Sequence, residues 1–367
     1  MKIFPFNAIY PNLELIASPD SFFGAVRENY SELYKYGFFH HSSDFAFYIL
    51  EIQLGDRMHT GLLTCFNIED YSKGKIVKHE QTIASSEQTM LKLILQRGAM
   101  VKPVLLCHPV MKDITKEIQK QKKKNKPFLE ITMASGANQY KIYQVKAKDG
   151  ELLAELYKSL VPKLYIADGH HRCSIAEKLL HLQGEKKEKD YSMVLAAVFP
   201  FDQLDILDYN RIVELPYHIK LTRFMAEISK VCEIQILSSP SKPVRKHDLT
   251  MYIDEDWYQL TWKEEVLRKY KKEPAILDAH VLDNEILEGI LGIKDVRTDS
   301  RVDYVSGDQG PTRVAEKAHA SNHHIGFCIY PVQFAELVKV SDHHGTLPPK
   351  STWFEPRMIN GMIVKSY

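Results

Sequence analysis

Long apolar runs, paired cysteines and an excess of charge of one sign are all absent from this sequence of 367 residues. No segment reaches the roughly 20 apolar residues that a membrane-spanning helix needs, and residues 1–16 lack the apolar core of a secretory signal. The five cysteines are scattered and form no CxxC pair or zinc spacing. We therefore expect reduced thiols, a cytoplasmic location and no membrane partner.

The balance of charge argues against nucleic acid as a partner. The chain has 48 Lys and Arg residues against 47 Asp and Glu residues, so it carries no general positive field. Without such a field, a phosphate backbone is not attracted over a long range. The lysine-rich segment 116–128 is short and has no interleaved aromatics, so it predicts a solvated surface.

The features that are present predict an α/β protein. A hydrophobic content of 44% and a charged content of 26% are ordinary for a globular chain. Strand-like and helix-like segments alternate early in the chain, which predicts an α/β domain over residues 1–215, followed by an α+β domain over residues 216–367. The main predicted segments are a hairpin over 45–67, helices over 150–160, 172–182 and 277–293, and strands over 103–109, 164–168, 191–199 and 324–332.

The segment 164–180, LYIADGHHRCSIAEKLL, has the most informative local pattern. A strand that ends at Asp168 and a helix that opens at about Arg172 present free backbone N–H groups and the positive end of a helix dipole. Gly169 lets an anion approach the backbone, Arg172 offers a bidentate donor, and side-chain donors come also from His170 and His171. The turn therefore predicts a phosphate site, such as one for the charged end of a nucleotide.

Two other interpretations of this turn are weaker. Asp168 alone fits as a helix cap, but an arginine and two histidines beside a strand end gain nothing for packing. Asp168, His170 and His171 are also legitimate metal ligands, which leaves a metal-dependent hydrolase as an alternative. Because adjacent histidines point in different directions and rarely complete one coordination sphere, we predict no metal site.

Motifs spread along the chain resemble one known family, the domain of unknown function 1015. Two of these motifs are specific, ADGHHR at 167–172 and PKSTWF at 349–354. Weaker matches are KHEQT at 78–82, YNRIV at 209–213 and LDAHVL at 277–282. The motifs keep the family's order, so the resemblance covers most of the chain.

This family is similar to the partition protein B and sulfiredoxin superfamily, in which a turn at a helix N-terminus holds the phosphates of a nucleotide. The resemblance implies a sulfiredoxin-like nucleotide-binding core over residues 1–215 and a C-terminal domain that closes the site. In sulfiredoxin the turn reads Gly-Cys-His-Arg, whereas His170 stands in place of the cysteine here, so reduction of sulfinic acids is disfavoured.

The free-serine kinase branch of this superfamily carries a similar Asp-Gly-His-His-Arg turn. It implies a kinase that uses ATP or ADP with Mg²⁺ to phosphorylate a small, serine-like hydroxylated metabolite. The partition-protein branch implies the alternative, which is a non-catalytic nucleotide or metabolite sensor, or a slow nucleotidase.

The resemblance also assigns roles to single residues. Glu80 stands where the similar kinases have a catalytic glutamate, and phosphoryl transfer uses such a base to accept the proton of the hydroxyl. Asp168 is the second expected catalytic residue, which either positions Arg172 or binds Mg²⁺ through water. Residues expected to contact substrate or support the site are His79, Asn210, Arg211, Lys350, Ser351 and Thr352.

Overall fold

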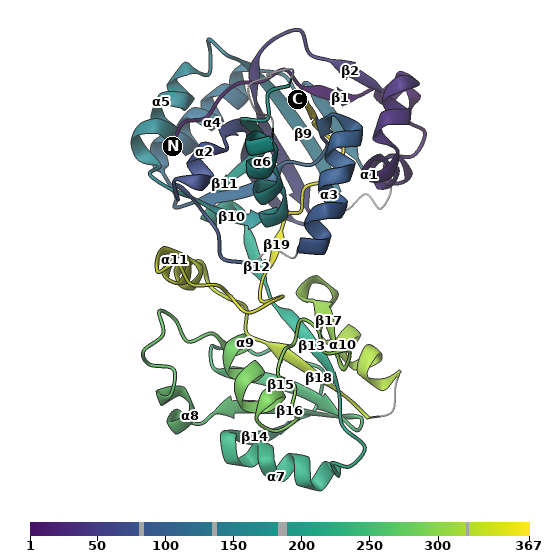
Figure 1. Ribbon diagram of the computed structural model, residues 1–367, viewed down its shortest axis with the longest axis vertical. Coiled ribbons are helices and arrows are strands. Elements are labelled where there is room, and N and C mark those ends of the chain that lie inside the picture. Colours follow the sequence, from purple (N-terminus) through teal and green to yellow (C-terminus); the bar gives the residue numbers. More distant parts are fainter. Residues whose placement is uncertain (81–83, 134–137, 183–188, 321–322) are drawn as a thin grey trace. The chain divides into compact units, whose positions relative to one another are not determined.

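The computed structural model describes the whole chain except residues 81–83, 134–137, 183–188 and 321–322. The described residues form two compact units, which we call unit 1 (residues 1–205 and 356–367) and unit 2 (residues 206–355) (Figure 1). The sequence predicts a boundary at 215–216, whereas the chain enters unit 2 earlier, because β13 (Tyr209–Glu214) pairs with strands of that unit.

A mixed sheet of eight strands forms the centre of unit 1, in the order β5-β10-β7-β11-β4-β3-β9-β8. The pairs β10–β5 and β11–β7 are parallel, while β10–β7 is antiparallel. Strands β7 and β11 are apolar and buried almost throughout, as their continuous apolar sequences predict. The strands of unit 1 are β1 (Ile9–Pro11), β2 (Phe39–His41), β3 (Ala46–Leu54), β4 (Arg57–Asn67), β5 (Ile76–Val77), β6 (Ala99–Met100), β7 (Val104–His108), β8 (Leu129–Thr132), β9 (Asn138–Lys146), β10 (Leu164–Asp168), β11 (Met193–Pro200) and β20 (Lys365–Ser366), and β12 (Asp205–Leu207) leads into unit 2.

Helices flank this sheet, and two of them position the candidate site. Helices α3 and α6 lie side by side (Figure 1) and share a buried cluster of Ile94, Ile175 and Leu179. This apolar contact holds α6 against α3. The helices of unit 1 are α1 (Pro19–Lys35), α2 (Glu69–Ser72), α3 (Ala84–Arg97), α4 (Lys112–Lys124), α5 (Glu151–Leu160) and α6 (His170–Leu182), with short 3₁₀ turns η1 (Leu13–Leu15) and η2 (Phe201–Gln203).

Unit 2 is built on an antiparallel sheet of six strands, in the order β14-β16-β15-β18-β13-β17. Its strands are β13, β14 (Cys232–Leu237), β15 (Asp248–Ile253), β16 (Asp256–Trp262), β17 (Val302–Ser306), β18 (His324–Ile329) and β19 (Trp353–Glu355), the last pairing with β12. Its helices are α7 (Leu221–Val231), α8 (Glu264–Arg268), α9 (Asp278–Val281), the π-helix η3 (Leu282–Glu288), the 3₁₀ turn η4 (Gly307–Gln309), α10 (Gly310–His319) and α11 (Phe334–Asp342).

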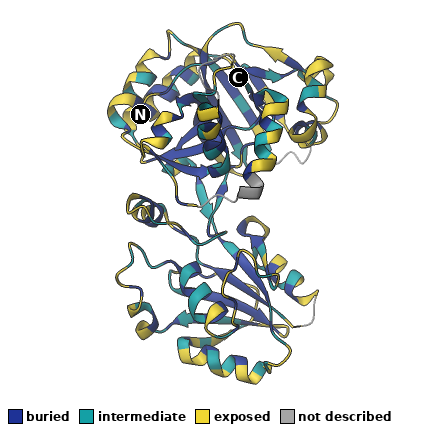
Figure 2. Cartoon of the chain, in the orientation of Figure 1, coloured by how far each residue is buried: buried dark blue, intermediate teal, exposed yellow. Residues whose placement is uncertain are grey.

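The structure confirms the predicted mixed α/β class. Figure 2 shows that the strands of both sheets are largely buried, whereas the outer surfaces of the helices are exposed. All five cysteines are buried and form no disulfide. Within the part of the chain that the structure describes, no helix is long and apolar enough to cross a membrane.

Candidate functional site

The predicted anion-binding turn joins β10 to α6. The helix begins at His170, earlier than the sequence predicts, so Gly169 alone separates the two elements. Gly169 has a φ of +112°, and a Cβ at this position would lie 2.7 Å from Nε of Arg172. A side chain would therefore strain the backbone and collide with the guanidinium group, which explains why this position needs glycine.

Three cationic side chains surround the carboxylate of Asp168. Arg172 Nη2 donates to its Oδ2 at 2.8 Å, Lys102 Nζ lies 3.5 Å from the same oxygen, and Arg357 Nη2 lies 3.8 Å from Oδ1. Burial alone would raise the pKa of Asp168, but the three cations outweigh it and hold that pKa well below its ordinary value. Burial lowers the pKa of Lys102 to about 8, against the attraction of Asp168. Asp168 thus accepts a hydrogen bond from Arg172, and its expected roles in catalysis stay predictions.

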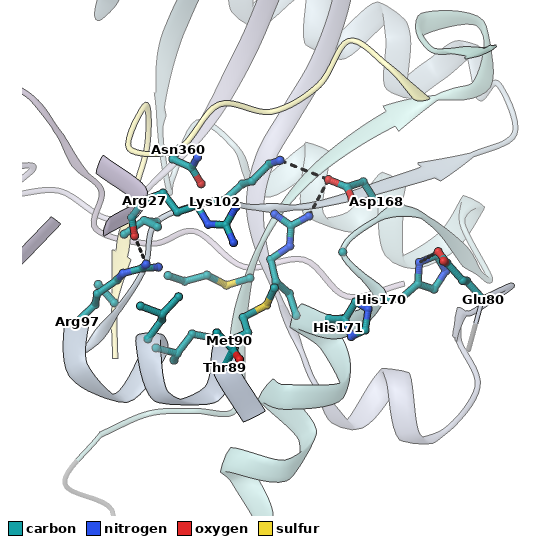
Figure 3. Close-up of a pocket in the computed structure, with 17 residues that line it drawn as sticks. Arg27, Glu80, Thr89, Met90, Arg97, Lys102, Asp168, His170, His171 and Asn360 are labelled. Atoms are coloured by element: carbon teal, nitrogen blue, oxygen red, sulfur yellow. Dashed lines mark hydrogen bonds and ion pairs between the residues drawn. The ribbon is translucent and has the colours of Figure 1, made fainter. Parts of the chain in front are cut away.

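A cavity of about 530 Å³ opens at the N-terminus of α6 (Figure 3). Nη1 of Arg172, a residue only 9% exposed, has no hydrogen-bond partner among the described residues, and the same holds for the buried Nδ1 of His171. Cations outnumber carboxylates in the lining, all of which belongs to unit 1, and the charged lining residues are Arg27, Glu80, Arg97, Lys102, Asp168 and Arg172. An excess of positive charge and buried groups without partners suit an anionic ligand.

Glu80 lines this cavity, and His79 packs against His170 of the turn. The side chain of Glu80 is 48% exposed, and its Oε2 lies 3.6 Å from Nδ1 of His170. The rings of His79 and His170 are buried and pack edge to face, with 4.5 Å between their centroids. Burial lowers the pKa of His170 to about 4 and that of His79 well below its ordinary value. Gln81 and Thr82, which complete the KHEQT motif, lie outside the described part of the chain.

The geometry gives no support to a metal centre or a thiol nucleophile at the turn. Among the described residues, no three His, Cys, Asp or Glu side chains are grouped so that they could hold a metal ion. The carboxylate of Asp168 is already paired with Arg172 and Lys102. Cys173, in the first turn of α6, is buried, and burial raises the pKa of its thiol to about 12, far from that of a reactive thiolate.

The remaining predicted residues lie in unit 2. Arg211 is fully buried, and its Nη1 donates to the backbone carbonyl of Lys350 at 2.7 Å. The side chain of Asn210 accepts a hydrogen bond from a backbone N–H of β18, and Ser351 donates to a carbonyl of its own loop. The contact of Arg211 attaches the loop that contains Lys350 to β13. Roles of these residues and of Thr352 in binding substrate stay predictions.

The sequence motifs do not identify five residues beside the turn, which are Arg27, Arg97, Lys102, Arg357 and Asn360. These residues come from distant parts of the chain. Lys102 reaches Asp168 because β7, which follows it, is the antiparallel neighbour of β10. That strand order cannot be deduced from the residue pattern. Only Arg357 had a nearby signal, since it lies three residues after the PKSTWF motif at 349–354.

Comparison with known proteins gives solved structures with distant similarity. A mutant free serine kinase in complex with ADP has a TM-score of 0.40 and 12% identity, with 84% of this chain and 94% of that chain covered. SbnI with a C-terminal truncation, from Staphylococcus aureus, has a TM-score of 0.43 and 12% identity, with 81% and 85% covered. Free serine kinase in complex with AMP has a TM-score of 0.38 and 12% identity, with 82% and 91% covered. Similarity at this level does not establish an activity.

The family is established by a different comparison. No curated protein matched the chain. The model of a family described as protein of unknown function (DUF1015) matches residues 7–284, which is more than half of the sequence. The chain therefore belongs to the DUF1015 family, as its motifs predicted.

Proposed function

We propose that this protein is a nucleotide-dependent phosphotransferase that acts on a small hydroxylated, serine-like metabolite. The observation that carries the proposal is the buried guanidinium of Arg172 at the cationic cavity, whose Nη1 lacks a hydrogen-bond partner among the described residues. A buried donor of this kind costs free energy unless a ligand satisfies it. An anionic group bound at the N-terminus of α6 would satisfy this donor.

The phosphates of ATP or ADP would lie against the first turn of α6. Backbone N–H groups there have no partner within the helix, and the helix dipole adds positive potential. Gly169 keeps the approach open, His171 and Arg172 add side-chain donors, and Lys102 adds charge. The volume of about 530 Å³ is in the range of small-molecule sites. Mg²⁺ would be held mainly by the phosphates, because Asp168 is committed to cationic side chains.

Glu80 is the residue that we assign as general base. It lines the same cavity and is half exposed, so a bound acceptor can reach its carboxylate. The hydroxyl oxygen of the acceptor attacks the terminal phosphorus, and its proton passes to the Glu80 carboxylate. The bond from that phosphorus to the bridging oxygen breaks, and ADP or AMP leaves. Positioning and neutralisation of charge by Arg172 and Lys102 supply most of the catalysis in such a reaction.

Separate measurements of binding and turnover test this proposal. In calorimetric titrations with ADP or ATP and Mg²⁺, Arg172→Met should weaken binding by about tenfold or more, since it removes a charged donor. Mass spectrometry should detect a phosphorylated product from a panel of serine and other small hydroxy acids. Glu80→Gln should abolish that product without weakening nucleotide binding. Glu130→Gln, which changes an exposed glutamate outside the cavity, is the matched control and should affect neither.

The possible outcomes separate the candidate functions. If no nucleotide binds, the proposal is wrong. If a nucleotide binds in a manner that depends on Arg172 but no acceptor is phosphorylated, the protein is a nucleotide sensor. If the nucleotide is hydrolysed without an acceptor, it is a nucleotidase.

A further inference from the structure

The ring of His170 has surroundings that phosphate binding does not explain. It is buried between α6 and the segment that precedes α3, where it packs against His79. Figure 3 places the ring beside Glu80. Its backbone N–H, at the first position of α6, belongs to the surface that we assign to phosphate, whereas its side chain has other partners.

Each ring nitrogen of His170 faces one partner. Nε2 accepts a hydrogen bond from the backbone N–H of His79, with 3.4 Å between the nitrogens. A backbone N–H can only donate, so Nε2 must carry a lone pair. Burial lowers the pKa of His170 to about 4, which makes the ring neutral near pH 7. A neutral imidazole with a lone pair on Nε2 carries its proton on Nδ1.

The Nδ1 atom that carries this proton lies 3.6 Å from Oε2 of Glu80. This distance exceeds that of a hydrogen bond, and catalytic contacts of this kind commonly tighten only when substrate is bound. The other charged or titratable groups around His170 are Asp168, which favours its protonation, and His171, Arg172 and Lys78, which oppose it, together with His79, whose ring packs against it. Glu80, whose Oε2 lies 3.6 Å from Nδ1, is therefore the carboxylate that we assign as the acceptor of a hydrogen bond from Nδ1–H.

We propose that His170 is the positioning residue of Glu80: its Nδ1–H donates a hydrogen bond to one carboxylate oxygen and keeps its proton, while the other oxygen accepts the proton of the acceptor hydroxyl. This inference rests on the proposed role of Glu80 as general base. The backbone N–H of His79 fixes the tautomer, and His170 in turn fixes the carboxylate. One residue thus serves both halves of the reaction, with its backbone toward phosphate and its ring toward the base.

The tautomer can be measured without any substrate. In protein labelled with ¹⁵N at histidine, long-range proton–nitrogen correlation spectra distinguish protonated from unprotonated ring nitrogens. The signals of His170 are assigned by their loss in His170→Asn. We expect a proton on Nδ1 and none on Nε2 at pH 7. A proton on Nε2 would overturn the proposal, and since the wild-type protein is measured, this result does not depend on the folding of a variant.

Two substitutions then separate the ring nitrogens in the kinetics. Asparagine places its amide nitrogen near the position of Nδ1, whereas glutamine places it near that of Nε2. With the acceptor found in the turnover assay, His170→Asn should keep kcat within about fivefold of the wild type, and His170→Gln should lose at least about tenfold. The KM for nucleotide should change little in either, and the acid limb of kcat/KM should move to higher pH only in His170→Gln.

A purely structural role for His170 predicts equal impairment of the two variants, and that result would also overturn the proposal. Failure of the proposed function looks different, because it abolishes turnover or nucleotide binding in the wild type. In that case the tautomer measurement still decides whether Nδ1 carries a proton that can form the hydrogen bond to Glu80.

Discussion

Replacing Gly169 by alanine would test whether the guanidinium of Arg172 is the ligand for phosphate. The new Cβ would lie 2.7 Å from Nε, 2.8 Å from Nη2 and 3.0 Å from Cζ of Arg172. Because the guanidinium is the end of a long side chain, it can move aside, but it must then leave Asp168, to which it donates at 2.8 Å. The substitution should therefore displace the donor and also strain the backbone.

The backbone strain should lower the free energy of unfolding, and the displaced guanidinium should lower the affinity for ADP. At a φ of +112°, alanine should cost roughly 1–3 kcal/mol in the free energy of unfolding. A hydrogen bond to a charged group is worth about 1.5–3 kcal/mol, so loss of the Arg172 contact should weaken ADP binding by about 10- to 150-fold. Gly55→Ala is the matched control, since Gly55 has a φ of +57° and nothing lies within 4 Å of its Cβ.

Urea unfolding measures the first effect and calorimetric titration with ADP measures the second. We expect both variants to lose stability, and only Gly169→Ala to lose affinity for ADP. If Gly169→Ala binds ADP as tightly as the wild type, Arg172 does not hold the phosphate in its present position and the reasoning fails. If Gly55→Ala loses the same affinity, the effect is one of general stability.

Three further predictions concern other charged groups. The pKa of Lys102 is about 8 and should rise beside a bound phosphate, so binding of ADP near pH 8 should take up roughly half a proton. Calorimetry in buffers of different ionisation enthalpy measures this uptake of protons. The variant Lys102→Met should show no such uptake. The pKa of Asp168 is lower in the folded than in the unfolded state, so the stability that it contributes is present above about pH 4 and is lost as the pH falls through the pKa of the folded state. Asp168→Asn should therefore be less stable than the wild type at pH 7. Urea titrations should show that the difference in free energy of unfolding between the two proteins narrows below about pH 4. Arg211→Met removes the cation beside the partly buried carboxylate of Asp283 and should destabilise unit 2 by roughly 3–5 kcal/mol. The double variant with Asp283→Leu should recover part of the loss, because the backbone carbonyls of Pro349 and Lys350 still lack their donor. Tryptophan fluorescence follows this unfolding, because all three tryptophans lie in unit 2.

Much of the fold was predictable because burial and periodicity act over short stretches of chain. The hairpin over 45–67 is confirmed as β3 and β4, which pair across a turn at Gly55, and the predicted strand over 103–109 is confirmed as β7. The predicted helix over 277–293 is in fact α9 followed by a π-helix. Its apolar residues Val281, Leu282, Ile286 and Leu287 are buried as predicted, but their spacing fits both kinds of helix.

The candidate site was predictable only as far as its residues are neighbours in sequence. The turn from Asp168 to Arg172 could be recognised because a strand end, a glycine and a helix start occur together there. The approach of Glu80 to His170 could not be derived, since it depends on how the segment before α3 packs on α6. The contact of Lys102 with Asp168 depends on the order of strands in the sheet, which local sequence does not encode.

Unit 2 interrupts unit 1 in the chain, which has a consequence for biosynthesis. Residues 356–367 return to unit 1, where Lys365 pairs with Met100 and Arg357 approaches Asp168. On the ribosome, residues 1–205 emerge first, yet Asn360 joins the cavity and Arg357 approaches Asp168 only after the whole of unit 2 has been translated. A chain that stops after unit 2 would present an anion-binding turn without these residues, so the site is assembled only after residues 356–367 have been translated.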